Sequence, residues 1–438
     1  MKKGFVVSLL ALAVIVLVSP GIVGHLAEQS MDENLDWAAT ESEEVTVTSQ
    51  GFDRGWFSSE GQHRVELRNG ELRDALLLLS SNDGDGNLPA LIIDTRIDHG
   101  LVPLSSMARD KGSLTPGLGS AISTVRLDFD DGSKVDLPGT IYSQVGLSGE
   151  LASNLVLDPG SFSDGDESAH WGNVNVLVTT SPSANAVTFS GTVDELAFVS
   201  SSNEVGINAV EFKGERRQTP FSFAVGDIEF SISSLTVPSA WGQDTIGPVS
   251  VTTSSSLDNE LLSGRVTSQL VDLPFGDLGR ATIALDAVAE GVDGRAISNL
   301  LRMYDDLDPY ASDEQLMAAA KGDLNRLLAG GFQINVDQLD VALQAGTVSA
   351  KLNIGVAATD MDEFVWTSAL MALDATLSLS VPEEFMDTII AIEPQMNAAI
   401  GMGFLKKNGA VYEMEAAFRN GLLTVNGAPM PIPIPGLQ

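Results

Sequence analysis

The histidines are the side chains with the widest chemical range in this chain, because cysteine is absent. The four are His25, His63, His99 and His170. No two of them lie at the short spacing typical of a metal site. His99 follows Asp98, a pairing that would suit acid–base chemistry, yet no nucleophile or second carboxylate completes a catalytic set. We therefore interpret His99 as a structural histidine near a strand end and predict no catalytic residue.

One acidic stretch resembles a calcium-binding loop. The segment "DGDGNLPALIID" (83–94) places Asp83, Asp85, Asn87 and Asp94 at loop positions 1, 3, 5 and 12. Leu88 stands where the loop needs glycine, and the last ligand would be aspartate instead of a bidentate glutamate. No helical pattern flanks the stretch, so an Asp/Gly turn between strands is the favoured interpretation. We predict no metal and no cofactor.

The composition excludes several classes of protein. The absence of cysteine removes disulfides, thiol catalysis and thiolate zinc sites. The net charge of −35 disfavours nucleic-acid binding, which needs a positive surface. Hydrophobic residues make up 44% of the 438 residues, enough for a large core. The acid-rich, lysine-poor composition predicts a protein from a halotolerant bacterium.

The N-terminal segment, residues 1–27, is predicted to be a signal-anchor. Lys2 and Lys3 precede an apolar run over residues 4–23, long enough to cross a bilayer as a helix. The positive-inside rule then places the N-terminus in the cytoplasm and the body in the periplasm, on a single pass through the inner membrane. A cleaved signal peptide is the alternative, disfavoured because the run is long and "SPGIVGHLAEQ" offers poor cleavage sites.

The body shows two kinds of pattern. Residues 28–50 form an acidic stalk that leads into a first strand at "VTVTS". Residues 51–291 contain short alternating runs such as "VNVLV", "VTFSGTV" and "IEFSISSLTV", which predict antiparallel strands with one buried face. Residues 292–438 mix strands and helices. The predicted fold is mainly β with minor α: a transmembrane helix, then an extended antiparallel sheet built as a sandwich, an open barrel or a curved groove.

Three helices and a closing hairpin are predicted in the C-terminal third. Residues 294–307 are helical, and Ser312 with Gln315 forms a capping box for a second helix that ends near Gly330. A third helix is predicted from about Glu383 to Met402. The end of the chain reads as a hairpin with Asn-Gly turns at 420–421 and 426–427.

Three segments carry a family resemblance. They are "GFDRGWFSSEG" (51–61, with Arg54, Gly55, Trp56, Phe57, Ser58 and Ser59), "TRIDHGLVPLS" (95–105, with His99 and Gly100) and "GAVYEMEAAFRNGLLTVNGAPMPI" (409–432). The chain resembles the YdgA-like family of bacterial envelope proteins, a family of unknown function. The second segment departs from the family pattern, because Leu101 and Val102 separate Gly100 from Pro103. The resemblance implies an inner-membrane anchor with a periplasmic body, and it implies no activity.

The aromatic pair in the first segment has its own physical interpretation. Gly51 and Gly55 permit close backbone approach, and Trp56 and Phe57 point to opposite faces if the segment is a strand. Trp56 lies about thirty residues beyond the apolar run, so interfacial anchoring is an alternative. A buried structural turn is favoured, since large aromatic side chains are usually part of a core.

The sequence therefore predicts a non-enzymatic, membrane-anchored protein of the envelope. Its expected partners are the inner membrane, through residues 4–23, and a phospholipid or another hydrophobic ligand held on a β-sheet groove. A scaffold for another envelope protein, bound through an exposed strand edge, is the first alternative. An enzyme of uncharacterised class acting near His99 is the second.

Overall fold

The computed structural model describes residues 45–54, 58–67, 88–99, 117–129, 132–164, 167–181, 185–199, 204–221, 223–239, 242–305, 312–359 and 365–430. The described chain is mainly β and antiparallel, and its α-helices all lie between residues 294 and 401. This confirms the predicted class of fold. The chain divides into two compact units, Met1–Arg217 with Phe230–Thr245, and Gln218–Glu229 with Ile246–Gln438.

The first unit is an antiparallel meander. Its strands, some of which end just beyond the unit, are β1 (Val45–Arg54), β2 (Ser58–Leu67), β3 (Ala90–His99), β4 (Gly119–Asp128), β5 (Lys134–Val145), β6 (Leu151–Leu157), β7 (Gly160–Asp164), β8 (Glu167–Trp171), β9 (Val174–Thr180), β10 (Ala186–Val199), β11 (Glu204–Gln218), β13 (Asp227–Ser239) and β14 (Gly242–Ile246). Neighbours in sequence pair from β1 to β6, and β6 then pairs with β9. The β7–β8 hairpin lies between them in sequence, and β8 pairs with β10.

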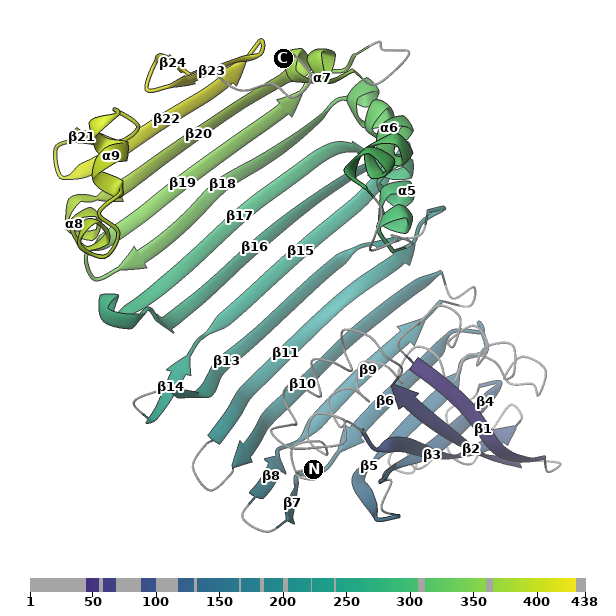
Figure 1. Ribbon diagram of the computed structural model, residues 1–438. Coiled ribbons are helices and arrows are strands. Elements are labelled where there is room, and N and C mark those ends of the chain that lie inside the picture. Colours follow the sequence, from purple (N-terminus) through teal and green to yellow (C-terminus); the bar gives the residue numbers. More distant parts are fainter. Residues whose placement is uncertain are drawn as a thin grey trace. The chain divides into compact units, whose positions relative to one another are not determined.

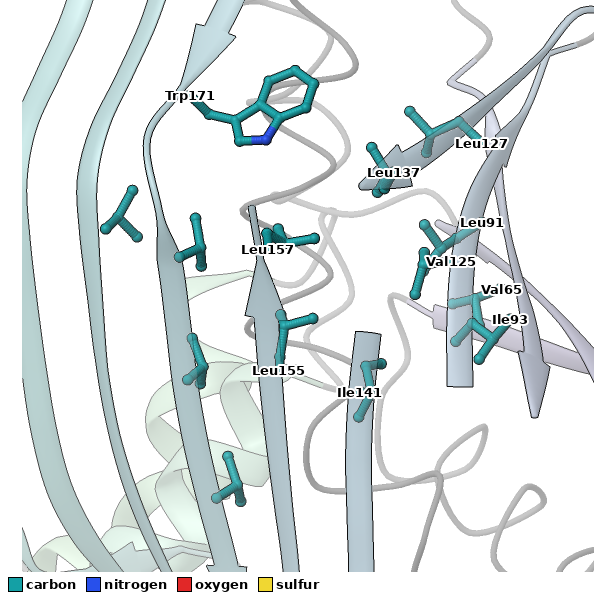
Figure 2. Packing of buried hydrophobic residues seen from close by; sticks show 14 of the residues in the cluster. Val65, Leu91, Ile93, Val125, Leu127, Leu137, Ile141, Leu155, Leu157 and Trp171 are labelled. Atoms are coloured by element: carbon teal, nitrogen blue, oxygen red, sulfur yellow. The ribbon is translucent and has the colours of Figure 1, made fainter. Parts of the chain in front are cut away.

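The core of the first unit lies on one face of this meander. Every second residue of β4, β6 and β9 is buried, as alternation predicts. Figure 2 shows side chains of β2 to β5, such as Ile93 and Leu127, facing those of β6 and the indole of Trp171 across a shared interior. Gly160 pairs with Trp171, and a Cβ there would lie 2.4 Å from the indole ring, so only glycine fits beneath it.

The second unit is built on long antiparallel strands. They are β12 (Ala224–Val225), β15 (Val249–Asp258), β16 (Leu261–Pro274), β17 (Arg280–Asp293), β18 (Phe332–Leu343), β19 (Gly346–Val356), β20 (Leu373–Pro382), β21 (Lys406–Asn408), β22 (Val411–Arg419), β23 (Leu422–Val425) and β24 (Ala428–Met430). A short 3-10 turn, η1 (Gly276–Leu278), joins β16 to β17. Strands β15 to β20 pair in order, followed by β22, β23 and β24.

Five helices stand at the ends of these strands. They are α5 (Gly294–Asp305), α6 (Asp313–Gly330), α7 (Trp366–Ala372), α8 (Glu383–Ile392) and α9 (Met396–Gly401). Figure 1 shows α5 and α6 at one end of the strands and α8 and α9 at the other end. The central lengths of the strands therefore run between two helical borders.

Two of the helical predictions can be judged in detail. Ser312 and Gln315 form the predicted capping box, and α6 ends at Gly330. The single helix predicted from Glu383 to Met402 is wrong, because α8 ends at Ile392 and α9 begins at Met396. Pro394 lies in the break: proline has no N–H to donate and disfavours helical backbone at the residue before it.

Both predicted Asn-Gly turns are confirmed. Asn420 and Gly421 have φ of 51° and 74°, and Asn426 and Gly427 have φ of 49° and 80°. Positive φ at both central residues is the backbone of a type I′ hairpin turn. Asn426 does more than turn the chain. Its Nδ2 donates to the carbonyls of Gly403 at 2.8 Å and Phe404 at 3.0 Å, and its Oδ1 accepts from the Glu415 N–H at 2.9 Å.

These turns allow a matched prediction. Asn426→Gly keeps a residue that adopts positive φ but removes three hydrogen bonds, so we expect the free energy of unfolding of the second unit to fall by about 1–3 kcal/mol. Asn420→Gly makes the same exchange at a turn where the asparagine side chain makes no hydrogen bond to a described residue, and we expect a much smaller loss of the free energy of unfolding. Urea unfolding of both variants measures the difference. Equal losses would show that the Asn426 side chain does not fasten the turn.

Candidate functional site: the apolar face of the second unit

The strands of the second unit separate apolar from polar residues. In β15 the alternate residues from Val249 to Leu257 are partly buried, and those between them are exposed. The same alternation continues in β19, where Ala350, Leu352 and Ile354 share one face. This face of β19 is apolar, whereas the matching face of β15 mixes apolar residues with Thr253 and Ser255.

The register of the strands aligns these residues into rows. We call the following the three central rows, each read from β17 through β18, β19 and β20 to β22. They are Leu285–Leu339–Ala350–Leu379–Met414, Ala287–Val336–Leu352–Leu377–Ala416 and Ala289–Ile334–Ile354–Ala375–Phe418. A bulge in β18 between Val336 and Leu339 keeps Leu339 opposite Leu285 and Ala350. Every member of the central rows is apolar.

The central rows are only partly covered. Among the residues of the three rows, only Phe418 is buried. Leu339 is 39% exposed, and Val266 of β16, which lies opposite Ala287, is 38% exposed. In the first unit, by contrast, the core-facing apolar side chains of β3, β4 and β6, such as Ile93, Leu127 and Leu155, are almost completely buried. A sheet normally buries its apolar face against a second layer, so this face is unusual for a folded domain.

One end of the apolar face is closed by a helix. Met386 of α8 and Leu405 are buried against Val381 of β20. Partly buried residues that join this cluster come from the helices and from the sheet: Val348, Leu379, Phe385, Ile390, Met396, Ile400, Tyr412 and Met414. Val381 pairs with Tyr412 of β22, and Val348 lies two residues from Ala350 on the same face of β19. Helix α8 therefore stands on the apolar face and borders the central rows.

The opposite face of the same strands is polar. Arg265 of β16 donates to the carboxylate of Asp286 of β17, and this hydrogen bond raises the pKa of the guanidinium. Asn353 donates to Asn335, and Arg419 donates to Asp374 at 3.2 Å. These groups satisfy one another at a surface that water reaches, so the sheet presents chemically opposite faces.

The first two family segments lie side by side in the first unit. Arg54 ends β1 and pairs with Ser59 of β2, while Ser58 pairs with Asp98 of β3. Residues 58–61 and 95–98 of the two segments therefore share one β-ladder, although they lie far apart in sequence. Ser59 is buried in that ladder, and His99 is the last residue of β3, opposite Gly119 of β4.

Other predicted residues lie elsewhere or outside the described residues. Gly55, Trp56, Phe57 and Gly100, the apolar run at 4–23, and Asp83, Asp85 and Asn87 of the calcium-like loop are outside them. Asp94 lies inside β3, where its carboxylate accepts hydrogen bonds from Arg126 and Gln62. Among the described residues, no group of three or more histidine or acidic side chains is arranged to hold a metal.

The described part of the chain contains no helix long and apolar enough to cross a membrane.

The sequence analysis did not find the central rows. The residues around Leu352 and Ile354 alternate cleanly in the sequence, but alternation in one strand says nothing about the neighbouring strand. The available signal was the recurrence of apolar alternation in the strands from β17 to β22.

A family profile described as "Bacterial protein of unknown function (DUF945)" matches residues 1–433. Protein YdgA of Escherichia coli (strain K12) is 23% identical over 224 residues, which cover 49% of this chain and 42% of that protein. The match thus spans less than half the length of this relative. No solved structure matches the chain.

Proposed function

The chain belongs to the DUF945 family of bacterial proteins of unknown function, and on this premise we propose that it is a non-enzymatic envelope protein that holds a lipid or another hydrophobic ligand. The ligand lies on the apolar face of the second unit. Residues 4–23 span the inner membrane once, and the body lies in the periplasm. The protein binds its ligand and does not convert it.

The observation that carries this proposal is the exposure of the central rows. Leu339 is more than one-third exposed although its cross-strand neighbours Leu285 and Ala350 are apolar. Val266 of β16, opposite Ala287, is exposed to a similar degree beside the rows. Exposed apolar area costs about 25 cal/mol per Å² relative to burial, and a large contiguous patch on a soluble surface usually marks a binding site. A hydrophobic ligand would remove this area from water.

The purified protein can be tested directly for a bound hydrophobic ligand. The chain without residues 1–27, exported to the periplasm and purified without detergent, is measured by native mass spectrometry and then extracted with organic solvent. We expect a bound hydrophobic molecule at a fixed ratio to the protein. A mass equal to that of the bare chain, with an empty extract, would contradict the proposal.

A further inference from the structure

We propose that the ligand is a lipid whose hydrocarbon chains lie across the strands, along the three central rows, with α8 closing one side of the site. This inference rests on the proposed function and adds the class of ligand and its placement. Its three supports are the chemistry of the rows, the position of α8 and the length of the rows across the strands.

The chemistry of the rows selects hydrocarbon. From β17 to β20 their members are alanine, valine, leucine and isoleucine, and none has a side chain that donates or accepts a hydrogen bond. The backbone N–H and C=O groups of these strands are used in the sheet ladders. An extended peptide laid flat on this face would leave backbone polar groups without partners, which is unfavourable. A hydrocarbon chain has no such groups and loses nothing.

The position of α8 disfavours a second copy of the chain as the occupant. Two sheets that pack face to face lie about 10 Å apart, which is also about the diameter of a helix with its side chains. Helix α8 already stands on the apolar face through Met386 and borders the row of Leu379. A second flat sheet would meet the helix before it lay evenly on the central rows. Flexible hydrocarbon chains can cover the central rows beside the helix.

The span of the rows suits an acyl chain. From β17 to β22 a row crosses four gaps between neighbouring strands, each about 4.8 Å, so it is roughly 19 Å long. One leaflet of a bilayer has a hydrocarbon thickness of about 15 Å. The acyl chain of a lipid from one leaflet therefore fits along a row. The polar headgroup of that lipid would lie beyond the end of the row.

Site-specific photocrosslinking in the full chain tests the proposal in living cells. A benzophenone amino acid replaces Leu339, which faces the central rows, or Gln338, which lies beside it and pairs with Asp286 on the polar face. The protein is irradiated, digested and analysed by mass spectrometry for lipid and peptide adducts. We expect lipid adducts at Leu339 and none above background at Gln338.

A pair of charged variants tests the central rows, with the benzophenone amino acid in place of Leu352. Leu339→Glu places a carboxylate on the central rows and is expected to lower the lipid adduct by about tenfold or more. Ser378→Glu places the same group on the polar face, where Ser378 pairs with Lys351, and should leave the adduct unchanged. Circular dichroism and limited proteolysis show whether both variants fold.

The outcomes separate this inference from the proposed function. A protein adduct at Leu339, from a second copy or another partner, would overturn the inference, and so would equal lipid yields on both faces. If the detergent-free preparation carries a hydrophobic ligand while Leu339 gives no lipid adduct, the proposed function stands and the placement fails. If the preparation carries nothing hydrophobic, both fail.

Discussion

Replacing Leu127 by alanine is expected to lower the free energy of unfolding of the first unit by about 3–5 kcal/mol. Leu127 is 0% exposed, and it lies in β4 between Leu91 of β3 and Val135 of β5. Its branched side chain points into the interior shown in Figure 2, where the curled sheet packs on itself. Alanine would lose the burial of that side chain and leave a cavity, because strands fixed on both sides cannot close in.

A matched change on the same unit provides the control. Leu177 of β9 is 43% exposed and lies on the face opposite the core, between the buried Val176 and Val178. Leu177→Ala removes the same atoms but should cost less than about 1 kcal/mol. Hydrogen exchange of the β3 to β5 amides, together with urea unfolding, reports on this unit. Equal losses for the two variants would contradict the assignment of Leu127 to the core.

Local patterns in the sequence predicted the individual elements well. The alternating run "VNVLV" predicts a strand with one buried face, and in β9 this face consists of Val174, Val176 and Val178 with Thr180. The capping residues at Ser312 and Gln315 work through contacts within a single turn. These predictions succeeded because the interactions that decide them lie within a few residues in the sequence.

The break between α8 and α9 was missed although its signal was present. Apolar residues at Met386, Ile389, Ile390 and Ile400 suggest one continuous helical face, and the prediction did not allow for Pro394. In the structure, the helical segments on both sides of the proline contribute to the same cluster on β20. Tertiary packing thus unites two short helices whose sequence looks like one.

The candidate site could not be assembled from sequence because it depends on register. Each strand reveals which of its own residues share a face, but a one-residue slip would place Gln338 beside Leu285 in place of Leu339. Bulges at Asp286–Ala287 and at Val336–Leu339 set the alignment across β17, β18 and β19. Such register shifts arise from the twist and pairing of whole strands, and short sequence motifs do not predict them.

Asp293 is expected to give the second large effect. It is the last residue of β17; its Oδ1 accepts from the Ala296 N–H of α5 at 2.8 Å, and its Oδ2 accepts from Arg326 of α6 at 3.0 Å. One partly buried carboxylate thus fastens both helices to the sheet. Asp293→Ala removes the helix cap and the ion pair, and we expect a loss of about 2–4 kcal/mol in the free energy of unfolding.

The control for this effect is a surface pair of the same type. Asp374 of β20 pairs with Arg419 of β22, and both side chains are more than half exposed. Asp374→Ala should cost less than about 1 kcal/mol, because water screens the pair. A loss as large as that of Asp293→Ala would mean that the position of Asp293 at the helix start has no special weight.

The charge of Asp293 also predicts a dependence on pH. Burial raises the pKa of this carboxyl, but the hydrogen bonds and charge of Arg326, with the backbone N–H groups of α5, outweigh burial and hold the pKa below the ordinary 3.8. A pKa that is lower in the folded state gives stability that is present above the unfolded value and is lost as the pH falls through the folded value.

Asp293→Asn keeps a good helix cap but removes the charge. The stability difference between the native chain and Asp293→Asn should therefore be largest near neutral pH and shrink below about pH 4, which urea unfolding across that range measures. A difference that stays constant down to about pH 2 would show that the carboxylate acts only as a cap.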